Sequence, residues 1–303
     1  MEARFVRQTA CPVCESAVFR PWRKGTFDAA ELDAEAVKIT DSHYGRVWDL
    51  SRCGRCGHTF ADPSPAPEFV DALYSRVQDP AYDDEAAGRA RNFTRLLRRL
   101  ESLRPERGSL CDVGAATGIL MDLARRRGWN VEGVEPSGWA VATARVKHGL
   151  VVRQGVFETA DVPPASFDAV TMVDLIEHTA RPRDTVAKAA EVLKTGGVLC
   201  LVTPDLRSPA ARLAGRRWWH FRPAHLAYFS RRGLEILLER AGFTVVARRR
   251  YAWTFSAHYL ALRLPLVRAV AGGRKTASFL RRIPIKLALG DSFEIYARKD
   301  RRP

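Results

Sequence analysis

Residues 109–137 constrain the fold more than any other part of the sequence. A short apolar run ends at Asp112, and two glycines, Gly114 and Gly118, follow it before a series of apolar residues at helical spacing. This order predicts a buried strand, a tight turn and the start of a helix. Glu135 follows the next apolar run, at the place where folds of this kind hold the carboxylate that binds a ribose diol. The stretch therefore predicts the opening of a doubly wound α/β domain.

The charge beside the turn indicates which nucleoside ligand it suits. The turn has two glycines four residues apart, so it lacks the three-glycine pattern of dinucleotide-binding proteins. A carboxylate at Asp112 would repel a pyrophosphate, but it suits a ligand that carries an ammonium group. S-adenosylmethionine has an ammonium group, a sulfonium and a ribose, and it has no phosphate. A generic nucleotide-binding α/β domain is the alternative interpretation.

At these residues the chain resembles the class I S-adenosylmethionine-dependent methyltransferases. The D-x-G-x-x-x-G loop of that family matches Asp112, Gly114 and Gly118, and its acidic residue on the second strand matches Glu135. The resemblance implies a doubly wound, seven-stranded sheet that ends in an antiparallel hairpin. It also implies a cofactor site at Asp112, Gly114, Ala115, Gly118, Glu135, Pro136, Phe157 and Asp174, with Phe157 against the adenine.

Residues 108–250 are predicted to form the S-adenosylmethionine-binding core. Apolar runs predict five strands that end at 112, 134, 153, 173 and 202, and two further strands over 243–250 and 292–298. Helices are predicted at 119–127, 139–148, 184–194 and 231–241. Ligands of open α/β sheets bind beyond the carboxyl ends of the strands. We therefore expect Asp112, Glu135, Phe157 and residues 174–178 to share one rim of the sheet.

Four cysteines near the amino terminus predict a separate zinc-ribbon-like module over residues 1–62. Cys11 and Cys14 form one C-x-x-C pair, and Cys53 and Cys56 form a second. Two such pairs complete a tetrahedral zinc site. Two disulfides and a redox C-x-x-C are the alternatives, but a cytosolic chain disfavours the former, and neither pair opens a helix of a thioredoxin-like unit.

The remaining segments surround the core. Residues 63–107 read as a proline-rich linker and helices that cover the cofactor, which would bring Tyr74 and Tyr82 near the donor or the acceptor. Residues 251–291 alternate apolar and basic side chains and interrupt the final hairpin. This basic amphipathic insertion is expected to be either a lid over the acceptor or a surface that contacts an anionic membrane. Residues 292–303 hold the last strand and the tail.

The formal net charge of +15 indicates an anionic partner, or else an arginine-rich chain with solvated arginines. No signal-peptide pattern opens the sequence, and no uncharged apolar run reaches the roughly 18 residues of a membrane span. The expected location is therefore the cytoplasm, with peripheral membrane contact as a further expectation. No pattern indicates an oligomeric state.

Histidines after the fourth core strand and later in the chain are the candidate catalytic residues. His178 follows Glu177, and this pair is similar to that of the ubiquinone-type small-molecule methyltransferases; His225 lies in an aromatic segment at 216–230. Either histidine suits removal of a proton from a hydroxyl acceptor. The resemblance thus implies O-methylation of a small molecule, a glycan or a lipid-linked substrate. RNA methylation and a non-catalytic zinc-binding adaptor are the alternatives.

Overall fold

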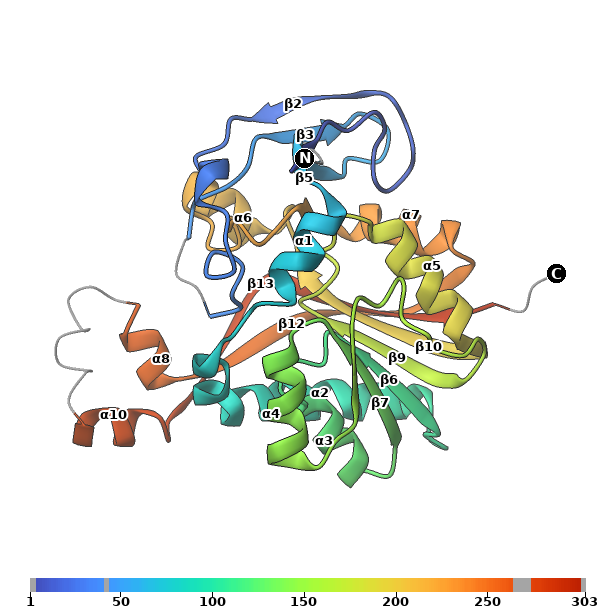
Figure 1. Cartoon of the computed structure of the whole chain (residues 1–303), viewed down its shortest axis with the longest axis vertical. Helices are drawn as coiled ribbons and strands as arrows, with labels where there is room; N and C mark the ends of the chain where they lie inside the picture. The colour runs from blue at the N-terminus through green and yellow to red at the C-terminus, as the bar shows by residue number, and fades with distance from the viewer. Residues whose placement is uncertain (1–3, 41–43, 264–273, 301–303) are drawn as a thin grey trace.

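A computed structural model describes residues 4–40, 44–263 and 274–300 of the chain. Its centre is a seven-stranded sheet in the order β12-β13-β10-β9-β6-β7-β8 (Figure 1). The strands pair in parallel except along β13, which is antiparallel to both β10 and β12. The bounds are β6 Ser109–Val113, β7 Asn130–Glu135, β8 Val152–Gln154, β9 Phe167–Val173, β10 Leu193–Pro204, β12 Phe243–Ser256 and β13 Pro284–Lys299. The predicted methyltransferase sheet is confirmed.

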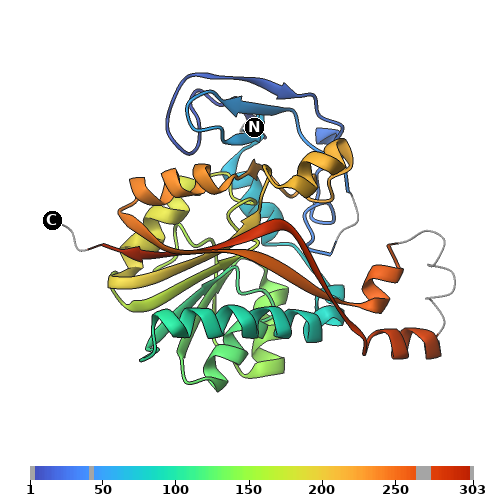
Figure 2. The same ribbon diagram turned by 180° about the vertical axis from the view of Figure 1, so that it is seen from behind.

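Helices cover both faces of this sheet because its strands are apolar on both sides. Helices α2 (Ala86–Leu103), α3 (Ile119–Arg126) and α4 (Gly138–His148) lie on one face, and α5 (Pro182–Val192) and α7 (Arg231–Arg240) lie on the other (Figures 1 and 2). Adjacent strand residues point to opposite faces: Leu110 packs with α2, and Cys111 packs in the cluster that contains α5 and α7. Cys111 and Cys200 are buried strand residues.

The amino-terminal module shares a sheet and a hydrophobic core with residues 218–228, which lie far along the chain. Its four-stranded sheet has the order β11-β4-β3-β2, where β2 is Phe19–Arg23, β3 is Leu50–Cys53, β4 is Thr59–Ala61 and β11 is Ala227–Tyr228. The short strands β1 (Phe5–Val6) and β5 (Ser64–Pro65) pair beside it. The indole nitrogen of Trp48 donates to the carbonyl of Pro223 at 2.7 Å, and Gly45 N donates to the Phe221 carbonyl at 2.8 Å. The aromatic segment at 216–230 therefore shares a core with the module.

The last two strands are longer than the sequence predicted. β12 continues to Ser256 and β13 begins at Pro284, so Trp253 pairs with Leu287 and Phe255 with Ile285. From residue 251, the alternating apolar and basic side chains indicated an insertion. In the paired residues of β12 and β13, this alternation is the two-residue period of β-strands. Helices α8 (Ala257–Ala261) and α10 (Arg274–Leu280) follow at its end, and residues 264–273 lie outside the described residues.

The linker forms helix α1 (Pro67–Tyr74) and the 3₁₀ segment η2 (Pro80–Glu85), which lead into α2. Helix α6 (Pro209–Ala214) precedes the aromatic segment, and the 3₁₀ turn η3 (Gly215–Arg217) leads into it. A further 3₁₀ turn, η1 (Ala29–Glu31), lies in the module. Among the described residues, no helix has the length and hydropathy that a bilayer span requires.

Candidate active site

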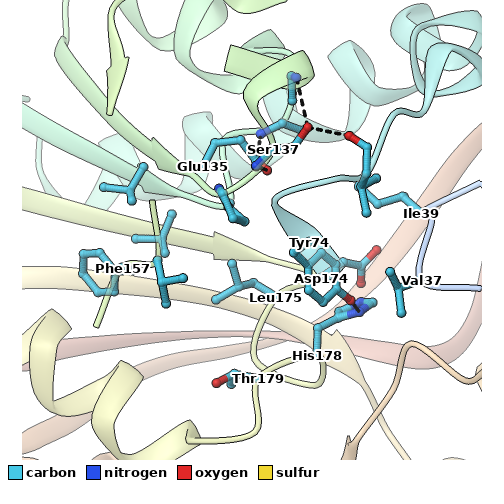
Figure 3. A pocket seen from close by; sticks show the side chains of 18 of the residues that line it. Val37, Ile39, Tyr74, Glu135, Ser137, Phe157, Asp174, Leu175, His178 and Thr179 are labelled. Carbon is cyan, nitrogen blue, oxygen red and sulfur yellow. Dashed lines mark hydrogen bonds between the residues drawn. The ribbon is translucent and has the colours of Figure 1, made fainter. Parts of the chain in front are cut away.

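A cavity opens at the carboxyl ends of β6, β7 and β9, beneath helix α1 (Figure 3). Six of the predicted site residues line it: Gly114, Glu135, Pro136, Phe157, Asp174 and His178. They come from four separate loops, so the fold brings together side chains that are distant in sequence. Tyr74 and Tyr82 line the same cavity, as expected from their place in the covering helices.

The glycine turn allows close approach between elements. Gly114 and Gly118 have φ values of 71° and 81°, which side chains rarely adopt. A Cβ at Gly114 would lie 2.5 Å from a methyl carbon of Leu175, and one at Gly118 would lie 2.7 Å from Leu150. Gly114 is on the cavity wall, whereas Ala115 and Gly118 lie in the turn beneath it. The two glycines are therefore required by geometry at both ends of the turn.

Glu135 is the acidic residue at the end of β7, and its carboxylate faces the cavity. Its two oxygens accept hydrogen bonds from the backbone N–H groups of Ala116 and Ser137, both at 2.9 Å. Burial raises the pKa of Glu135, although these two hydrogen bonds oppose the shift. Each carboxylate oxygen keeps a lone pair, so the group is held in place and can still accept from two vicinal hydroxyls. This arrangement fits the ribose of S-adenosylmethionine.

Asp112 differs from the sequence-based expectation. Its side chain is 4% exposed, and its Oδ1 accepts a hydrogen bond from the Thr171 hydroxyl at 2.7 Å within the sheet, beneath the cavity wall. Asp174, at the end of β9, lines the cavity instead, and its Oδ1 is inaccessible to solvent and has no hydrogen-bond partner among the described residues. Burial raises the pKa of Asp174. Because Asp174 lines the cavity and Asp112 does not, Asp174 is the better candidate of the two for contact with the ammonium of the cofactor.

The burial of Asp112 predicts an unusual dependence of stability on pH. Burial raises its pKa from an ordinary value of 3.8 to about 7, so the folded chain binds this proton more tightly than the unfolded chain. Stability is therefore lost as pH rises from 5 to 8, by roughly 2–3 kcal/mol from this group. In Asp112→Asn this contribution disappears, and urea unfolding at pH 5 and pH 8 should show a smaller decrease than in the wild type. Equal decreases would contradict the assignment.

Tyr74 and His178 form a hydrogen-bonded pair on the cavity wall. The Tyr74 hydroxyl lies 2.7 Å from His178 Nδ1 (Figure 3). With the ring proton on Nε2, the neutral His178 ring accepts a hydrogen bond from the Tyr74 hydroxyl at Nδ1. Burial lowers the pKa of His178 to about 3. The ring is therefore neutral near pH 7.

His225 does not line the cavity. It is buried behind His178, with the two ring centres 4.7 Å apart at a steep angle. Burial and the neighbouring His178 lower its pKa well below the usual range. His225 is therefore placed to support the His178 ring and has no direct route to an acceptor in the cavity.

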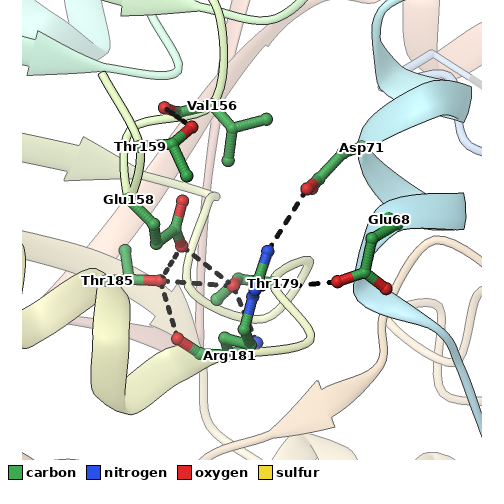
Figure 4. Close-up of polar contacts among 8 residues, drawn as sticks. All are labelled: Glu68, Asp71, Val156, Glu158, Thr159, Thr179, Arg181 and Thr185. Atoms are coloured by element: carbon green, nitrogen blue, oxygen red, sulfur yellow. Dashed lines mark hydrogen bonds and ion pairs between the residues drawn. The ribbon is translucent and has the colours of Figure 1, made fainter. Parts of the chain in front are cut away.

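An ionic and hydroxyl network ties the cavity mouth to α1 (Figure 4). Arg181, in the loop after β9, lies 3.4 Å from Asp71 and 3.8 Å from Glu68, both on α1. On its other side, the Glu158 carboxylate accepts hydrogen bonds from the hydroxyls of Thr179 and Thr185. These contacts hold the covering helix against the loops that follow β8 and β9.

Further wall residues come from segments that the sequence motifs did not indicate. Val37 and Ile39 belong to the amino-terminal module, Trp253 to β12, and Arg89 to α2. The module loop is held in place because Thr40 donates to the Asp79 carboxylate through both its backbone N–H and its hydroxyl. Of these residues, Arg89 lies in the segment 63–107 that the sequence predicted to cover the cofactor, and Trp253 lies in the segment 251–291 that it predicted as a lid or membrane surface.

A family of methyltransferase domains matches residues 85–248, which is more than half of the chain. This chain belongs to the methyltransferase domain family. The matched segment contains the glycine turn, Glu135 and His178, and its cofactor is S-adenosylmethionine, as predicted from the turn.

The chain is similar to ubiquinone biosynthesis O-methyltransferases of several bacteria. That of Azoarcus sp. (strain BH72) is 30% identical over 156 residues, which cover 48% of this chain and 64% of the relative. That of Xanthomonas campestris pv. campestris (strain B100) is 36% identical over 107 residues, or 33% and 44% of the two chains. This methyltransferase chain therefore spans less than two thirds of the length of these relatives.

Two solved structures share the fold. A chain from the complex of the Haloferax volcanii Trm112 methyltransferase activator with a methyltransferase is 17% identical, with a TM-score of 0.52 over 78% of this chain and 100% of that one. A SAM-dependent methyltransferase from Archaeoglobus fulgidus is 17% identical, with a TM-score of 0.50 over 73% of this chain and 100% of that one.

The amino-terminal module, which precedes the matched methyltransferase domain, carries the predicted four-cysteine cluster. The sulfurs of Cys11 and Cys56 are 3.6 Å apart, as are those of Cys14 and Cys53, and all four lie within 4.8 Å of one another. Four thiolates at Zn–S distances of ~2.3 Å define a tetrahedron with edges of about 3.8 Å. The cluster is confirmed, and its geometry fits one structural zinc ion.

Proposed function

We propose that this chain transfers a methyl group from S-adenosylmethionine to a hydroxyl oxygen of a small-molecule acceptor. The observation that carries the proposal is the Tyr74–His178 hydrogen bond on the wall of the same cavity that holds Glu135. One part of the cavity thus offers groups for a cationic nucleoside, and another part offers a neutral proton acceptor. The names of the curated relatives, which are O-methyltransferases, support the same reaction class.

Four groups would hold the methyl donor. Glu135 would accept from the ribose hydroxyls, Phe157 would contact the adenine, and the Asp174 carboxyl group would lie nearest the ammonium. The turn at Gly114 lets the backbone approach the ligand closely. S-adenosylmethionine, when bound, supplies a methyl carbon activated by positively charged sulfur.

The acceptor's proton would leave through the tyrosine–histidine pair. As the acceptor oxygen forms its bond to the methyl carbon and the carbon–sulfur bond breaks, its proton passes to the Tyr74 oxygen, and the Tyr74 proton passes to His178 Nδ1. The Glu177 carboxyl group lies within 4.8 Å of a His178 ring nitrogen. Burial raises the pKa of Glu177, and a positive charge on the ring would favour the ionised carboxylate. His225 would hold the ring in position through their edge-to-face contact.

The wall of the cavity supports a small acceptor over a nucleic acid. Val37, Ile39 and Val70 give its outer part an apolar surface, and helix α1 covers it. A nucleic-acid strand would require a polar, open groove with cations along it. We therefore place RNA methylation second.

The end of the β12–β13 hairpin supports a peripheral membrane role in the same proposal. The hairpin extends away from the body of the molecule (Figures 1 and 2), and Phe279 and Ile285 are 66% and 37% exposed there. Arg281 and Arg282 lie beside them. Among the described residues of 251–291, only Trp253 lies on the cavity wall. Contact with an anionic membrane therefore accounts for the hairpin end better than a lid does.

Replacement of the paired residues tests the reaction. Tyr74→Phe and His178→Gln should each lower kcat about 100-fold or more, because general base catalysis typically contributes that much. Binding of S-adenosylmethionine, measured by calorimetry, should change less than about threefold. Turnover is followed as radioactive methyl transfer to a panel of phenols, catechols and sugars, with host RNA as a separate acceptor.

His148→Gln is the matched control, because His148 lies on α4 away from the cavity. It should keep wild-type turnover. Methyl transfer that survives in both Tyr74→Phe and His178→Gln, or that reaches RNA alone, would overturn the proposed reaction.

A further inference from the structure

A second pocket lies on the sheet rim beyond β10 and shares no wall residue with the methyl-transfer cavity. Four arginines and one carboxylate contribute to its lining, which consists of Asp205, Arg207, Ser208, Pro209, Ser230, Arg231, Arg232, Arg250, Leu289 and Gly290. The arginines come from the β10–α6 loop, the start of α7 and the middle of β12. Such convergence of guanidinium groups from three elements is not required by the methyltransferase reaction.

The backbone around this pocket is fixed by local hydrogen bonds. Asp205 N donates to the Asp291 carbonyl at 2.7 Å, which joins the β10–α6 loop to β13. Ser230 caps α7 by accepting from Gly233 N at 3.1 Å. Gly290 has a φ of 69°, and the Arg250 side chain passes 3.7 Å from the position that a Cβ would occupy there. A Cβ at that distance would make ordinary van der Waals contact with Arg250, so the positive φ of residue 290 is what favours glycine there.

The positive charge of the pocket exceeds its negative charge. Arg231 lies 3.4 Å from Asp205, and Arg232 lies 3.6 Å from Glu239 outside the lining. Arg207 and Arg250 form no ion pair with any carboxylate in the described ranges of the chain. Two guanidinium groups therefore remain for a ligand, and the amino-terminal end of the ten-residue helix α7 adds partial positive charge beside them.

Arginines of the neighbouring module sheet strengthen this charge. Arg52, on β3, is near Arg207, and the pKa of Arg52 is lowered by burial and by the positive charges of Arg207, Arg23 and Arg20. The Arg52 guanidinium lies 3.9 Å over the Trp22 ring and donates from Nε to a threonine hydroxyl, so these contacts do not cancel its charge. A multivalent anion would relieve the repulsion among these cations.

We propose that this second pocket binds a phosphoryl group, either as free phosphate or as a phosphate monoester on a small molecule. A phosphoryl dianion has a charge that balances two unpaired guanidinium groups. Its several oxygens can accept bidentate hydrogen bonds from the planar guanidinium N–H groups. A carboxylate would neutralise one of them. This binding site goes beyond methyl transfer and stands independently of it, because the two pockets have separate walls.

Titration calorimetry with the full zinc-loaded chain tests the site. The probes are inorganic phosphate, phenyl phosphate and acetate, and the variant is Arg207→Gln combined with Arg250→Gln. The wild type should bind both phosphates at least tenfold more tightly than acetate, and the double variant should lose at least tenfold of that affinity. Tighter binding of phenyl phosphate than of inorganic phosphate would identify a monoester as the source, and the reverse order would identify free phosphate.

The matched control is Arg91→Gln combined with Arg98→Gln, which removes the same charge from exposed positions on α2. It should keep wild-type affinity for phosphate. An equal loss of phosphate affinity in the two double variants would overturn the proposal, because it would indicate non-specific attraction by positive charge. An equal loss of affinity for a 20-nucleotide RNA in the two double variants would overturn it for the same reason. Affinity for S-adenosylmethionine should stay unchanged in all these variants, so failure here would leave the methyltransferase assignment intact.

Discussion

Glu135→Ala is expected to lower the affinity of this chain for S-adenosylmethionine by about three orders of magnitude. The carboxylate would accept from two ribose hydroxyls, and hydrogen bonds to a charged group contribute roughly 1.5–3 kcal/mol each. Two such bonds amount to about 4 kcal/mol, or ~1,000-fold in the dissociation constant. The variant also leaves the backbone N–H groups of Ala116 and Ser137 without their acceptor, which loosens the turn. Titration calorimetry measures the loss.

Glu132→Ala is the control, because Glu132 lies on the same strand with a side chain that is 44% exposed and paired with Arg153. Its affinity for the cofactor should match the wild type. A thermal melt of Glu135→Ala separates lost binding from lost structure. If the folded Glu135→Ala chain bound S-adenosylmethionine with wild-type affinity, the ribose assignment would be wrong.

The core of the fold could be predicted because its signals are local in sequence. The strand, glycine turn and helix at 109–126 are contiguous, and each glycine is needed where two elements approach within a few ångströms. The same is true of the C-x-x-C pairs, since both thiols of a pair lie in one turn. Patterns of this kind do not depend on the rest of the chain.

Asp112 shows where local reasoning fails within the site. Its position beside the turn suggested contact with the ligand, but its side chain lies within the sheet against Thr171 of β9. Side chains of a strand alternate in direction, and the neighbouring strands decide what each one meets. Asp174 lines the cavity instead, and its place after β9 gave no sign that its Oδ1 would be buried without a hydrogen-bond partner among the described residues.

The relation between the module and the core could not be predicted from sequence. Strand β11 has two residues, Ala227 and Tyr228, which pair with Thr59 and Phe60 of the module. Trp48 finds its hydrogen-bond acceptor 175 positions away. No periodicity extends over such distances, so residues 1–62 read as an appendage, although Val37 and Ile39 form part of the cavity wall.

Because of this continuity, loss of the zinc site should affect the whole molecule. Cys53→Ser is expected to reduce bound zinc from one equivalent to almost none and to lower the melting temperature by at least about 10 °C. Serine does not supply a thiolate, and binding of structural zinc contributes roughly 10 kcal/mol or more in small zinc modules. The four cysteines pack in one apolar cluster with Phe229 and Leu234, so disorder in the module would reach α7. Metal analysis and scanning fluorimetry measure both effects.

Cys111→Ala distinguishes loss of zinc from loss of a buried sulfur. Cys111 is also buried, but it lies in β6, outside the four-cysteine cluster. It should keep one equivalent of zinc while losing modest stability through the small cavity it leaves. In Cys53→Ser, by contrast, acceptor turnover should fall further than cofactor affinity, because the module supplies acceptor-side wall residues and Glu135 belongs to the core sheet. Full zinc content and an unchanged melting temperature in Cys53→Ser would show that the cluster does not hold the metal.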